Sequence, residues 1–258
     1  MRHVPRKRFG QHFLTDDSII AAIIAAIAPQ PGDSMVEIGP GLGALTHPLA
    51  RKLDHLHVVE IDRDIIAWLR TEFPATRVTV HEGDALAFDF GALGPRLRVV
   101  GNLPYNISTP LLFHLARYAG AIRDIHAMLQ KEVVERMIAA PSTSEYGRLS
   151  VMLQYRFEME QVLEVTAAAF NPAPKVESAV IRLTPYSPLP HPARDEAILG
   201  KIVAAAFSKR RKTLRNALGS YFEAAEFERL GVDARLRAQD LRVTDFVRMA
   251  DAIAGRAA

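Results

Sequence analysis

The fold is decided by residues 35–43, which read MVEIGPGLG. The first four residues form a short, mostly apolar run of the kind that makes a buried strand. The glycines that follow let the backbone turn sharply, and they let a ligand approach without meeting a Cβ atom. A helix is expected next, at residues 44–53. A strand that enters a glycine turn and leaves it as a helix predicts an α/β sheet that binds a ligand beyond the carboxyl ends of its strands.

Strands and helices alternate on both sides of this turn. A helix is expected at residues 16–28, with Thr15 or Asp16 as its N-cap and prolines after its end. Further strands are expected at residues 57–61, 77–80, 97–100 and 124–129, and further helices at 64–72 and 109–118. Residues 162–165 and 178–183 have the pattern of an antiparallel pair that closes the sheet. This order predicts a doubly wound, mostly parallel Rossmann-like sheet covered by helices on both faces.

The pattern changes after a proline-rich segment. Residues 184–192 read TPYSPLPHP, and a segment with four prolines cannot continue a helix or a strand. Beyond it, residues 196–207, 211–222 and 244–253 show the apolar spacing of helices. Four parts are therefore expected: a basic arm at 1–15, an α/β domain at 16–184, a linker at 185–192 and a smaller all-helical domain at 193–258.

Composition limits the classes of protein. The chain has 258 residues, of which 49% are hydrophobic, and it contains no cysteine, which excludes disulfides and thiolate metal sites. The nine histidines are scattered without metal-ligand spacing, so no metal is expected. The longest apolar stretch, residues 19–28, is about half as long as a membrane-spanning helix, and no signal-peptide pattern is present. We therefore expect a cytoplasmic protein without a membrane partner.

The net charge of +3 conceals an uneven distribution. Residues 1–10 carry four basic side chains and no acidic one, and residues 187–258 carry thirteen basic and nine acidic side chains. Two basic ends around an acidic middle are typical of an enzyme that contacts a polyanion outside its core. A solvated surface of uneven charge would give the same totals, so charge alone leaves a nucleic-acid partner open.

Acidic residues after the second and third strands indicate which ligand the glycine turn binds. Glu60 ends the second strand, where a carboxylate can accept hydrogen bonds from two ribose hydroxyls. Dinucleotide sites share this feature, and a tight turn beside a solvated Glu60 would also produce it. However, the spacing is G-x-G-x-G instead of G-x-G-x-x-G, and Asp84 stands where it can bind an adenine amino group, unless it only forms a turn. The pattern favours S-adenosylmethionine, held by Gly39, Gly41, Glu60, Asp84 and Ala85.

Residues 100–105, VGNLPY, follow the fourth strand and therefore lie beside the cofactor. An adenine amino nitrogen is a poor nucleophile, because its lone pair is delocalised into the ring. Two acceptors on its N–H bonds localise that lone pair, and the Asn102 side-chain oxygen and the Pro104 carbonyl oxygen suit this role. Tyr105 can stack on the base, a contact worth about 1–3 kcal/mol. A plain turn with a core tyrosine is the alternative, but the place after this strand favours N6 methylation of adenine by positioning.

A second proline motif, FNPAPK at residues 170–175, precedes the last strand and can reach the same end of the sheet. Phe170 can then form the second face of a base sandwich with Tyr105, so we add it to the catalytic candidates. The target base would first have to flip out of its stack. A buried phenylalanine before a proline turn is the alternative.

Four motifs together resemble one family. They are RKRFGQHFL at residues 6–14, VEIGPG at 36–41, GNLPYNIS at 101–108 and FNPAPKV at 170–176. The set closely resembles the small-subunit ribosomal RNA adenine N6,N6-dimethyltransferases, the bacterial kasugamycin-sensitivity enzymes, over nearly the whole chain. DNA adenine methyltransferases usually carry proline at the position of Leu103, so this residue favours an RNA target.

The resemblance implies dimethylation of two adjacent adenines in the 3′-terminal hairpin of 16S rRNA, within the 30S particle during small-subunit maturation. It implies that the cofactor site is lined by His12, Leu14, Gly39, Glu60, Asp84 and Asn102. The chain departs from the family at His12, where asparagine is usual. A neutral histidine still offers one donor and one acceptor, and whether this contact uses the side chain or the backbone stays open.

RNA is expected to contact basic residues near both ends of the chain. Residues 208–215, SKRRKTLR, carry five basic side chains and no acid, and on a helix Arg211 and Arg215 share one face. Phosphate contacts there supply affinity and register but no sequence choice. A solvated basic face is the alternative. The expected RNA contacts are Arg6, Lys7, Arg8, Lys209, Arg210, Arg211, Lys212 and Arg215.

Two other functions fit parts of the pattern. One is methylation of large-subunit RNA, against which the proline-rich linker and the basic 209–215 segment argue. The other is an RNA-binding assembly factor without catalysis, against which the glycine turn, Glu60 and Asn102 argue. We expect an enzyme that acts as a monomer on the 30S subunit.

Overall fold

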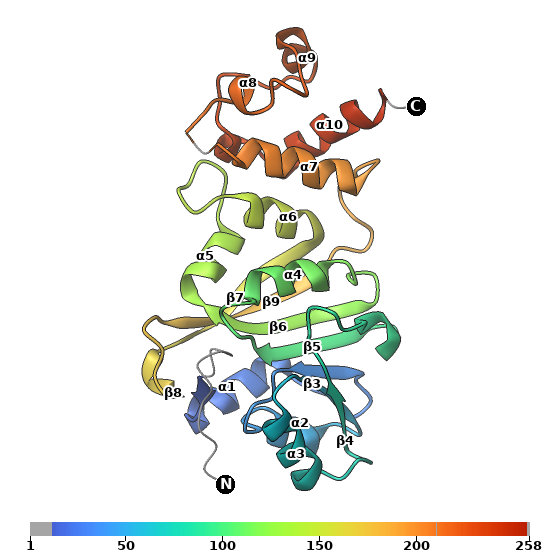
Figure 1. Cartoon of the computed structure of the whole chain (residues 1–258), viewed down its shortest axis with the longest axis vertical. Coiled ribbons are helices and arrows are strands. Elements are labelled where there is room, and N and C mark those ends of the chain that lie inside the picture. Colours follow the sequence, from blue (N-terminus) through green and yellow to red (C-terminus); the bar gives the residue numbers. More distant parts are fainter. Residues whose placement is uncertain (1–11, 210, 257–258) are drawn as a thin grey trace. The chain divides into compact units, whose positions relative to one another are not determined.

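The computed structural model describes residues 12–209 and 211–256 (Figure 1). The chain divides into two compact units. Unit 1 comprises Met1–Val134 and Glu158–Pro185, and unit 2 comprises Glu135–Phe157 and Tyr186–Ala258. Within the described residues, no helix is long and apolar enough to cross a membrane.

Unit 1 is built on a seven-stranded sheet with the strand order β4-β3-β2-β5-β6-β9-β7. Its strands are β2 (Met35–Ile38), β3 (Leu56–Glu60), β4 (Val78–Glu82), β5 (Leu97–Asn102), β6 (Ile122–Gln130), β7 (Phe157–Val165) and β9 (Ser178–Pro185). Neighbouring strands from β4 to β6 pair in parallel, and β9 pairs antiparallel with β6. The mostly parallel α/β sheet expected from the sequence is therefore confirmed.

Four helices alternate with the parallel strands: α1 (Asp17–Ile27), α2 (Thr46–Lys52), α3 (Arg63–Glu72) and α4 (Ser108–Ala116). Asp16 is the N-cap of α1, because its side chain accepts the N–H groups of Ser18 and Ile19. Thr15 has a different partner, since its N–H donates to the carbonyl of Ala169 at 2.8 Å. Short 3-10 turns at Phe90–Leu93 and Ala167–Ala169 complete the connections.

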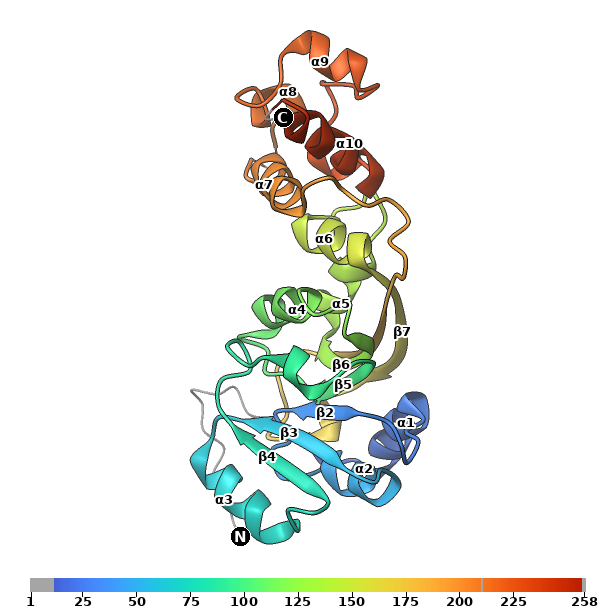
Figure 2. The ribbon, with the colours of Figure 1, turned by 90° about the vertical axis from the view of Figure 1, so that its right-hand side faces the viewer.

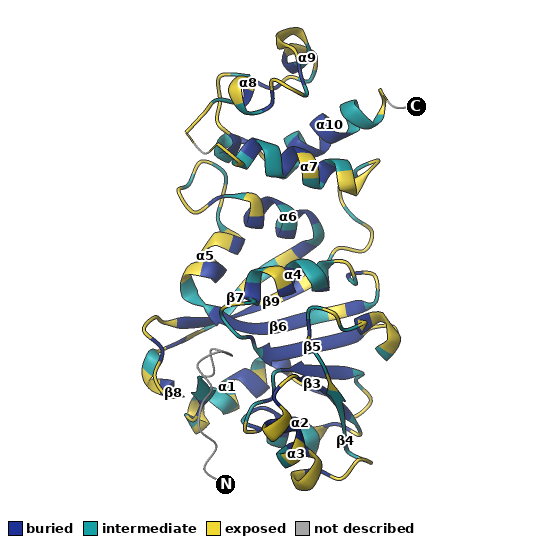
Figure 3. Cartoon of the chain, viewed as in Figure 1, coloured by how far each residue is buried: buried dark blue, intermediate teal, exposed yellow. Residues whose placement is uncertain are grey.

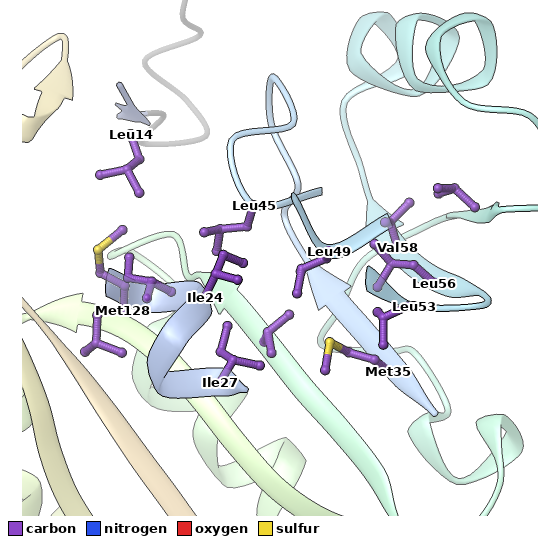
Figure 4. Close-up of a cluster of buried hydrophobic side chains, with 14 of the residues drawn as sticks. Leu14, Ile24, Ile27, Met35, Leu45, Leu49, Leu53, Leu56, Val58 and Met128 are labelled. Carbon is purple, nitrogen blue, oxygen red and sulfur yellow. The ribbon is translucent and has the colours of Figure 1, made fainter. Parts of the chain in front are cut away.

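The main core of unit 1 joins these helices to the sheet. Side chains from α1 and α2 form one buried cluster with β2, β3 and Met128 of β6 (Figure 4). Ile65 and Leu69 of α3 belong to the same cluster. All four residues of β2 are buried, and β5 and β6 are also mostly buried (Figure 3). Parallel strands covered on both faces require such continuous burial. Each aliphatic side chain in the cluster contributes about 1.5–3 kcal/mol, so the core holds the carboxyl ends of the strands in fixed places.

A second, two-stranded sheet was not anticipated from the sequence. Strand β1 (Phe13–Leu14) pairs antiparallel with β8 (Phe170–Asn171), so that Phe13 lies opposite Asn171 and Leu14 opposite Phe170. Strands of two residues have no detectable periodicity, and this pairing joins segments far apart in the chain. It places Phe13 and Leu14 beside the FNPAPK motif.

Unit 2 is helical. It contains α6 (Arg148–Arg156), α7 (Glu196–Phe207), α8 (Leu214–Ala217), α9 (Ala224–Arg229), α10 (Val243–Ala254) and a 3-10 turn at Ala238–Asp240. Helices α7 and α10 lie side by side in Figures 1 and 2. Helix α5 (Lys131–Ile138) begins in unit 1 and ends in unit 2.

The unit boundaries differ from the expected domain boundaries. Residues 135–157 were expected within the α/β domain of 16–184, but they belong to unit 2. The physical reason is packing, since Tyr146, Val151 and Tyr155 are buried in the same cluster as the side chains of α7 and α10. The helical unit is therefore assembled from two separate stretches of the chain.

The expected helix at residues 211–222 is wrong, because only Leu214–Ala217 is helical. The N–H of Lys212 donates to the carbonyl of Lys209 at 2.8 Å, which closes a turn. Thr213 then forms a bridge with Arg237, and the N–H of Leu214 donates to Leu236 at 2.8 Å. Leu214, Leu218 and Phe222 are all buried. Their spacing of four residues resembles that of a helix, but these residues are buried from a short helix and the turns around it.

Candidate active site

A cavity of about 480 Å³ lies at the carboxyl ends of β2, β3, β4 and β5 in unit 1. Its volume is in the range of small-molecule sites. Its walls include every residue expected to bind the cofactor: His12, Leu14, Gly39, Gly41, Glu60, Asp84, Ala85 and Asn102. Pro104 and Tyr105 line the same cavity. The glycine turn, the acidic residues after the next two strands and the VGNLPY loop therefore converge on one place.

Two glycines allow the segments that form the cavity wall to lie close to one another. A Cβ atom on Gly101 would lie 2.5 Å from the carbonyl oxygen of Ile38, so only glycine lets the ends of β5 and β2 touch. Gly41 has a φ of +53°, and a Cβ atom there would lie 3.2 Å from the ring of Phe13. Strand β1 thus passes directly over the glycine turn. Phe13 was not expected as a wall of the site.

Glu60 is 7% exposed, and its Oε1 accepts the N–H groups of Ile61 at 2.8 Å and Asp62 at 2.9 Å. Burial raises the pKa of Glu60, and these backbone hydrogen bonds oppose the shift. A carboxylate has about four acceptor positions, so capacity remains for ligand hydroxyls. The carboxylate is held in place before a ligand arrives.

Glu37 is a second buried acid in the wall, and sequence reasoning missed it as a site residue. It is 2% exposed, and its Oε2 accepts the hydroxyl of Thr46 at 2.7 Å. Burial raises the pKa of Glu37 to about 8, and the nearby Glu60 adds to the shift. The signal in the sequence was an acidic residue inside an otherwise apolar strand.

Asp84 is exposed, and its Oδ1 accepts the N–H of Leu86 at 2.9 Å. This is the turn geometry that the sequence left open as an alternative. The same residue lines the cavity, and a carboxylate with two oxygens can serve a turn and a ligand together. Ile61, which is 48% exposed, and Ala85 supply apolar surface beside the two acids.

The side chain of Asn102 has a defined orientation. Its Nδ2 donates to the backbone carbonyl of His12 at 3.0 Å. Because a carbonyl oxygen can only accept, the amide nitrogen must face His12, and Oδ1 is left as the acceptor. The carbonyl of Pro104 accepts the N–H of Ile107 at 3.1 Å, and its second lone pair is still available. Both predicted acceptors of the catalytic loop therefore keep accepting capacity.

Tyr105 is held by its hydroxyl group and by one face of its ring. Its hydroxyl lies 2.6 Å from Oγ of Ser178, and its ring stacks on that of His12 with centroids 5.8 Å apart and planes at 25°. Burial raises the pKa of Tyr105, and the hydrogen bond to Ser178 opposes the shift. Ser178 was not expected in the site, because a serine at the start of a strand carries no particular signal.

Phe170 has a different position from the one expected. It is 4% exposed, packs in the core cluster with Leu14 and is not a wall of the cavity. The alternative of a buried phenylalanine before a proline turn describes this arrangement. The aromatic ring that stacks on Tyr105 is His12 instead. In this arrangement, Phe170 is a core residue, and its strand β8 pairs with β1 at Leu14.

The expected RNA contacts lie apart from these motifs in the chain. Lys209, Arg211, Lys212 and Arg215 are exposed residues of unit 2, but the turn before α8 means that they do not form one helical face. Arg6, Lys7, Arg8 and Arg210 lie outside the described residues. Within residues 12–209 and 211–256, no group of three or more His, Asp or Glu side chains has the geometry of a metal site.

Comparison with known proteins decides the family. Residues 2–255 match the family model described as ribosomal RNA adenine dimethylase. The chain belongs to this family. The match confirms the expected class of enzyme, an S-adenosylmethionine-dependent methyltransferase of ribosomal RNA adenine.

Relatives of this chain are similar over nearly their whole length. A protein of Methylobacillus flagellatus named Ribosomal RNA small subunit methyltransferase A is 61% identical, over 98% of this chain and 100% of the relative. A protein of the same name from Thiobacillus denitrificans is 62% identical, over 95% of this chain and 96% of the relative.

Two solved structures share the fold of this chain. A dimethyladenosine transferase from Plasmodium falciparum has a TM-score of 0.80 and 26% identity, over 92% of this chain and 96% of that one. The 23S rRNA methyltransferase ErmE has a TM-score of 0.71 and 25% identity, over 94% of this chain and 99% of that one. These likenesses confirm the α/β methyltransferase fold.

Proposed function

We propose that the chain transfers methyl groups from S-adenosylmethionine to N6 of two adjacent adenines in the 3′-terminal hairpin of 16S rRNA, within the 30S particle. The observation that carries this proposal is the oriented Asn102 amide, whose oxygen is left to accept at the wall of the cavity. The similarity to relatives named for the small ribosomal subunit supports the choice of RNA. The reaction would belong to small-subunit maturation in the cytoplasm, with the enzyme acting as a monomer.

The cavity fits S-adenosylmethionine, which supplies an electrophilic methyl group. The buried Glu60 carboxylate would accept the two ribose hydroxyls, and Asp84 the adenine amino group. Ile61 and Ala85 offer apolar surface to the adenine ring. Strand β1 passes close to the glycine turn, so His12 and Leu14 lie in the same cavity wall. These two residues would contact the part of the cofactor that the acids do not bind.

The chemistry would depend on acceptors and not on a strong base. Asn102 Oδ1 and the Pro104 carbonyl would accept the two N–H bonds of the adenine amino group, which localises the lone pair of the nitrogen for attack. Tyr105 would stack on the flipped base and hold it in line. The attacking nitrogen becomes acidic once it is alkylated, so its proton can pass to water.

The basic residues of unit 2 would supply the phosphate contacts. Lys209, Arg211, Lys212 and Arg215 are exposed, and no ion pair joins them to an acid among the described residues. Such contacts give salt-dependent affinity without sequence choice. Arg6, Lys7, Arg8 and Arg210 remain further candidates for the same role.

The proposal is tested with ribosomal subunits from a strain that lacks this methylation. Purified 30S and 50S subunits are incubated with the protein and isotope-labelled S-adenosylmethionine, and their RNA is digested and analysed by mass spectrometry. We expect two adjacent N6,N6-dimethyladenines in a fragment of the 16S 3′ end. Label confined to the 50S subunit would establish the large-subunit alternative, and the absence of label from both subunits would refute methylation of either subunit.

A further inference from the structure

His12 connects three segments at the wall of the cavity. Its ring nitrogen Nδ1 lies 2.8 Å from the carbonyl oxygen of Pro172, and its own carbonyl accepts Nδ2 of Asn102 at 3.0 Å. Its ring stacks on Tyr105. Since the Pro172 oxygen can only accept, Nδ1 must carry the proton in this contact. One residue therefore joins the FNPAPK motif, the catalytic amide and the base-stacking tyrosine.

The register of the small sheet explains why a side chain makes this link. Phe13 lies opposite Asn171, so the next antiparallel positions are those of His12 and Pro172. Proline has no N–H, and it cannot donate a backbone hydrogen bond to continue the ladder. The imidazole N–H of His12 extends the connection by one position instead. This link holds the backbone at His12, including the carbonyl that faces Asn102.

We propose that His12 is a positioning residue for the catalytic amide of Asn102. The side-chain link to Pro172 fixes the His12 carbonyl, and this carbonyl selects the amide orientation in which Oδ1 is free to accept from adenine. In the flipped orientation, the amide would turn N–H donors toward the adenine amino group, where two sets of donors repel. The inference rests on the proposed role of Asn102 in adenine methylation.

Asparagine, the usual residue of the family at this position, can make the same link. Its side-chain nitrogen is as many bonds from the backbone as Nδ1 of histidine, and both are donors. Phenylalanine keeps a ring for Tyr105 but has no donor, and alanine has neither. The substitutions His12→Asn, His12→Phe and His12→Ala therefore separate the hydrogen bond from the ring contact.

The kinetic test measures kcat and KM for 30S subunits, and Kd for S-adenosylmethionine, in the three variants. We expect kcat to fall between about tenfold and a hundredfold in His12→Ala and in His12→Phe, because the amide is misplaced. His12→Asn should recover most of that loss. Because His12 also lines the cofactor cavity, Kd for S-adenosylmethionine should rise as well, but by a smaller factor than the fall in kcat. His191→Ala, an exposed histidine outside the site, is the matched control.

A spectroscopic test follows the amide itself and needs no activity. The chain contains only four asparagines, at 102, 106, 171 and 216, so 15N-asparagine labelling gives four side-chain NH2 signals. The Asn102 pair is assigned with an Asn102→Ser variant. We expect this pair to shift in His12→Ala and His12→Phe and to stay near its original position in His12→Asn, whose new asparagine adds a fifth pair. His191→Ala should leave all four pairs in place.

Three results would overturn the inference. Full kcat in His12→Phe would mean that the donor is not needed. Equal losses in His12→Asn and His12→Ala would assign the role to the imidazole ring. A weaker Kd with unchanged kcat would make His12 a cofactor-binding residue only. If the unaltered protein fails to methylate 30S subunits, the proposed function fails, whereas the Asn102 signals still report whether His12 orients the amide.

Discussion

The phenolic oxygen of Tyr105 lies 2.6 Å from the hydroxyl oxygen of Ser178. Tyr105 follows β5 and Ser178 begins β9, so this hydrogen bond spans the intervening strand β6. Ser178 is completely buried. Because the surrounding atoms restrict the movement of its hydroxyl, the hydrogen bond holds the Tyr105 ring in place. The site is therefore held together across three strands of the sheet, and the orientation of Tyr105 is set before a base arrives.

Substitution of Tyr105 separates the role of its ring from that of its hydroxyl. We expect Tyr105→Ala to lower kcat/KM for 30S subunits between about fivefold and a hundredfold, since stacking is worth about 1–3 kcal/mol. Tyr105→Phe keeps the ring and loses only the bond to Ser178, so it should lose much less activity. Steady-state methylation measures both. Equal activity in Tyr105→Ala and the unaltered protein would remove the ring from base binding.

Removal of the Asn102 amide should stop transfer while the fold is kept. We expect Asn102→Ala to lower kcat by at least about a hundredfold, because the variant has no acceptor for the reacting amino group. Asn102→Asp should also fail, since its carboxylate would face the His12 carbonyl that now accepts Nδ2 at 3.0 Å. Circular dichroism and thermal melting check the fold. Near-normal turnover in Asn102→Ala would refute the acceptor role.

Glu60 should determine cofactor affinity. In Glu60→Gln, the new amide can no longer accept from two hydroxyls, and its NH2 group would compete with the N–H donors of Ile61 and Asp62. We expect Kd for S-adenosylmethionine to rise between about tenfold and a hundredfold, measured by calorimetry. The exposed Glu164 provides the control Glu164→Gln. A Kd that equals the control value would mean that Glu60 does not bind the ribose.

The parts of the site that local patterns encode were predictable. The strand at Met35–Ile38, the glycine turn after it and the Asp16 cap all occur where the pattern indicated. Glu60 and Asn102 were found because parallel strands bring their carboxyl ends to one edge. Such signals depend on residues that are neighbours in the chain or on a general rule of sheet topology.

The missed parts depend on contacts between distant segments. The pairing of Phe13 with Asn171 gives no periodic pattern in the sequence. This pairing places His12, and not Phe170, against Tyr105. The helix expected at residues 211–222 was wrong for a related reason. Leu214 and Leu218 repeat at helical spacing, yet residues 234–236 take the hydrogen bonds that would have started a longer helix. No local pattern distinguishes a helix from a turn held by a distant strand-like segment.

Protonation of His57 should weaken unit 1 in mildly acidic solution. Burial, with His81 and His55 nearby, lowers the pKa of His57 to about 4 from its usual 6.5, and its Nδ1 lies 3.0 Å from Nε2 of His81. Between these two values, the unfolded chain binds the proton and the folded chain does not. The contribution of His57 is therefore complete above about pH 6.5 and is lost as the pH falls toward 4.

A variant without a titrating group at this position isolates the effect. In His57→Gln, the side-chain amide can still bond to His81. We expect the difference in urea midpoint between the unaltered protein and His57→Gln to shrink or reverse from pH 7 to pH 4.5. A difference that stays constant over this range would show that His57 has equal pKa values in both states.

The exposed cations before α8 should govern the salt dependence of binding to 30S subunits. Lys209, Arg211 and Lys212 have no ion pair among the described residues, so replacing all three by alanine removes three candidate partners for RNA phosphates. We expect weaker binding, and a plot of log K against log salt whose slope is shallower by about 0.7–0.9 for each phosphate that is no longer neutralised.

A second triple variant removes the same charge from the same unit. Arg229, Arg235 and Arg248 pair with Glu226, Asp233 and Asp245 respectively, so their charges are already compensated within the chain. Their replacement by alanine should leave the slope almost unchanged, because few counterions are displaced by paired groups. Binding of labelled protein to 30S subunits across a potassium chloride series measures both slopes. Equal slopes in the two variants would remove Lys209, Arg211 and Lys212 from the RNA interface, since only net charge would then matter.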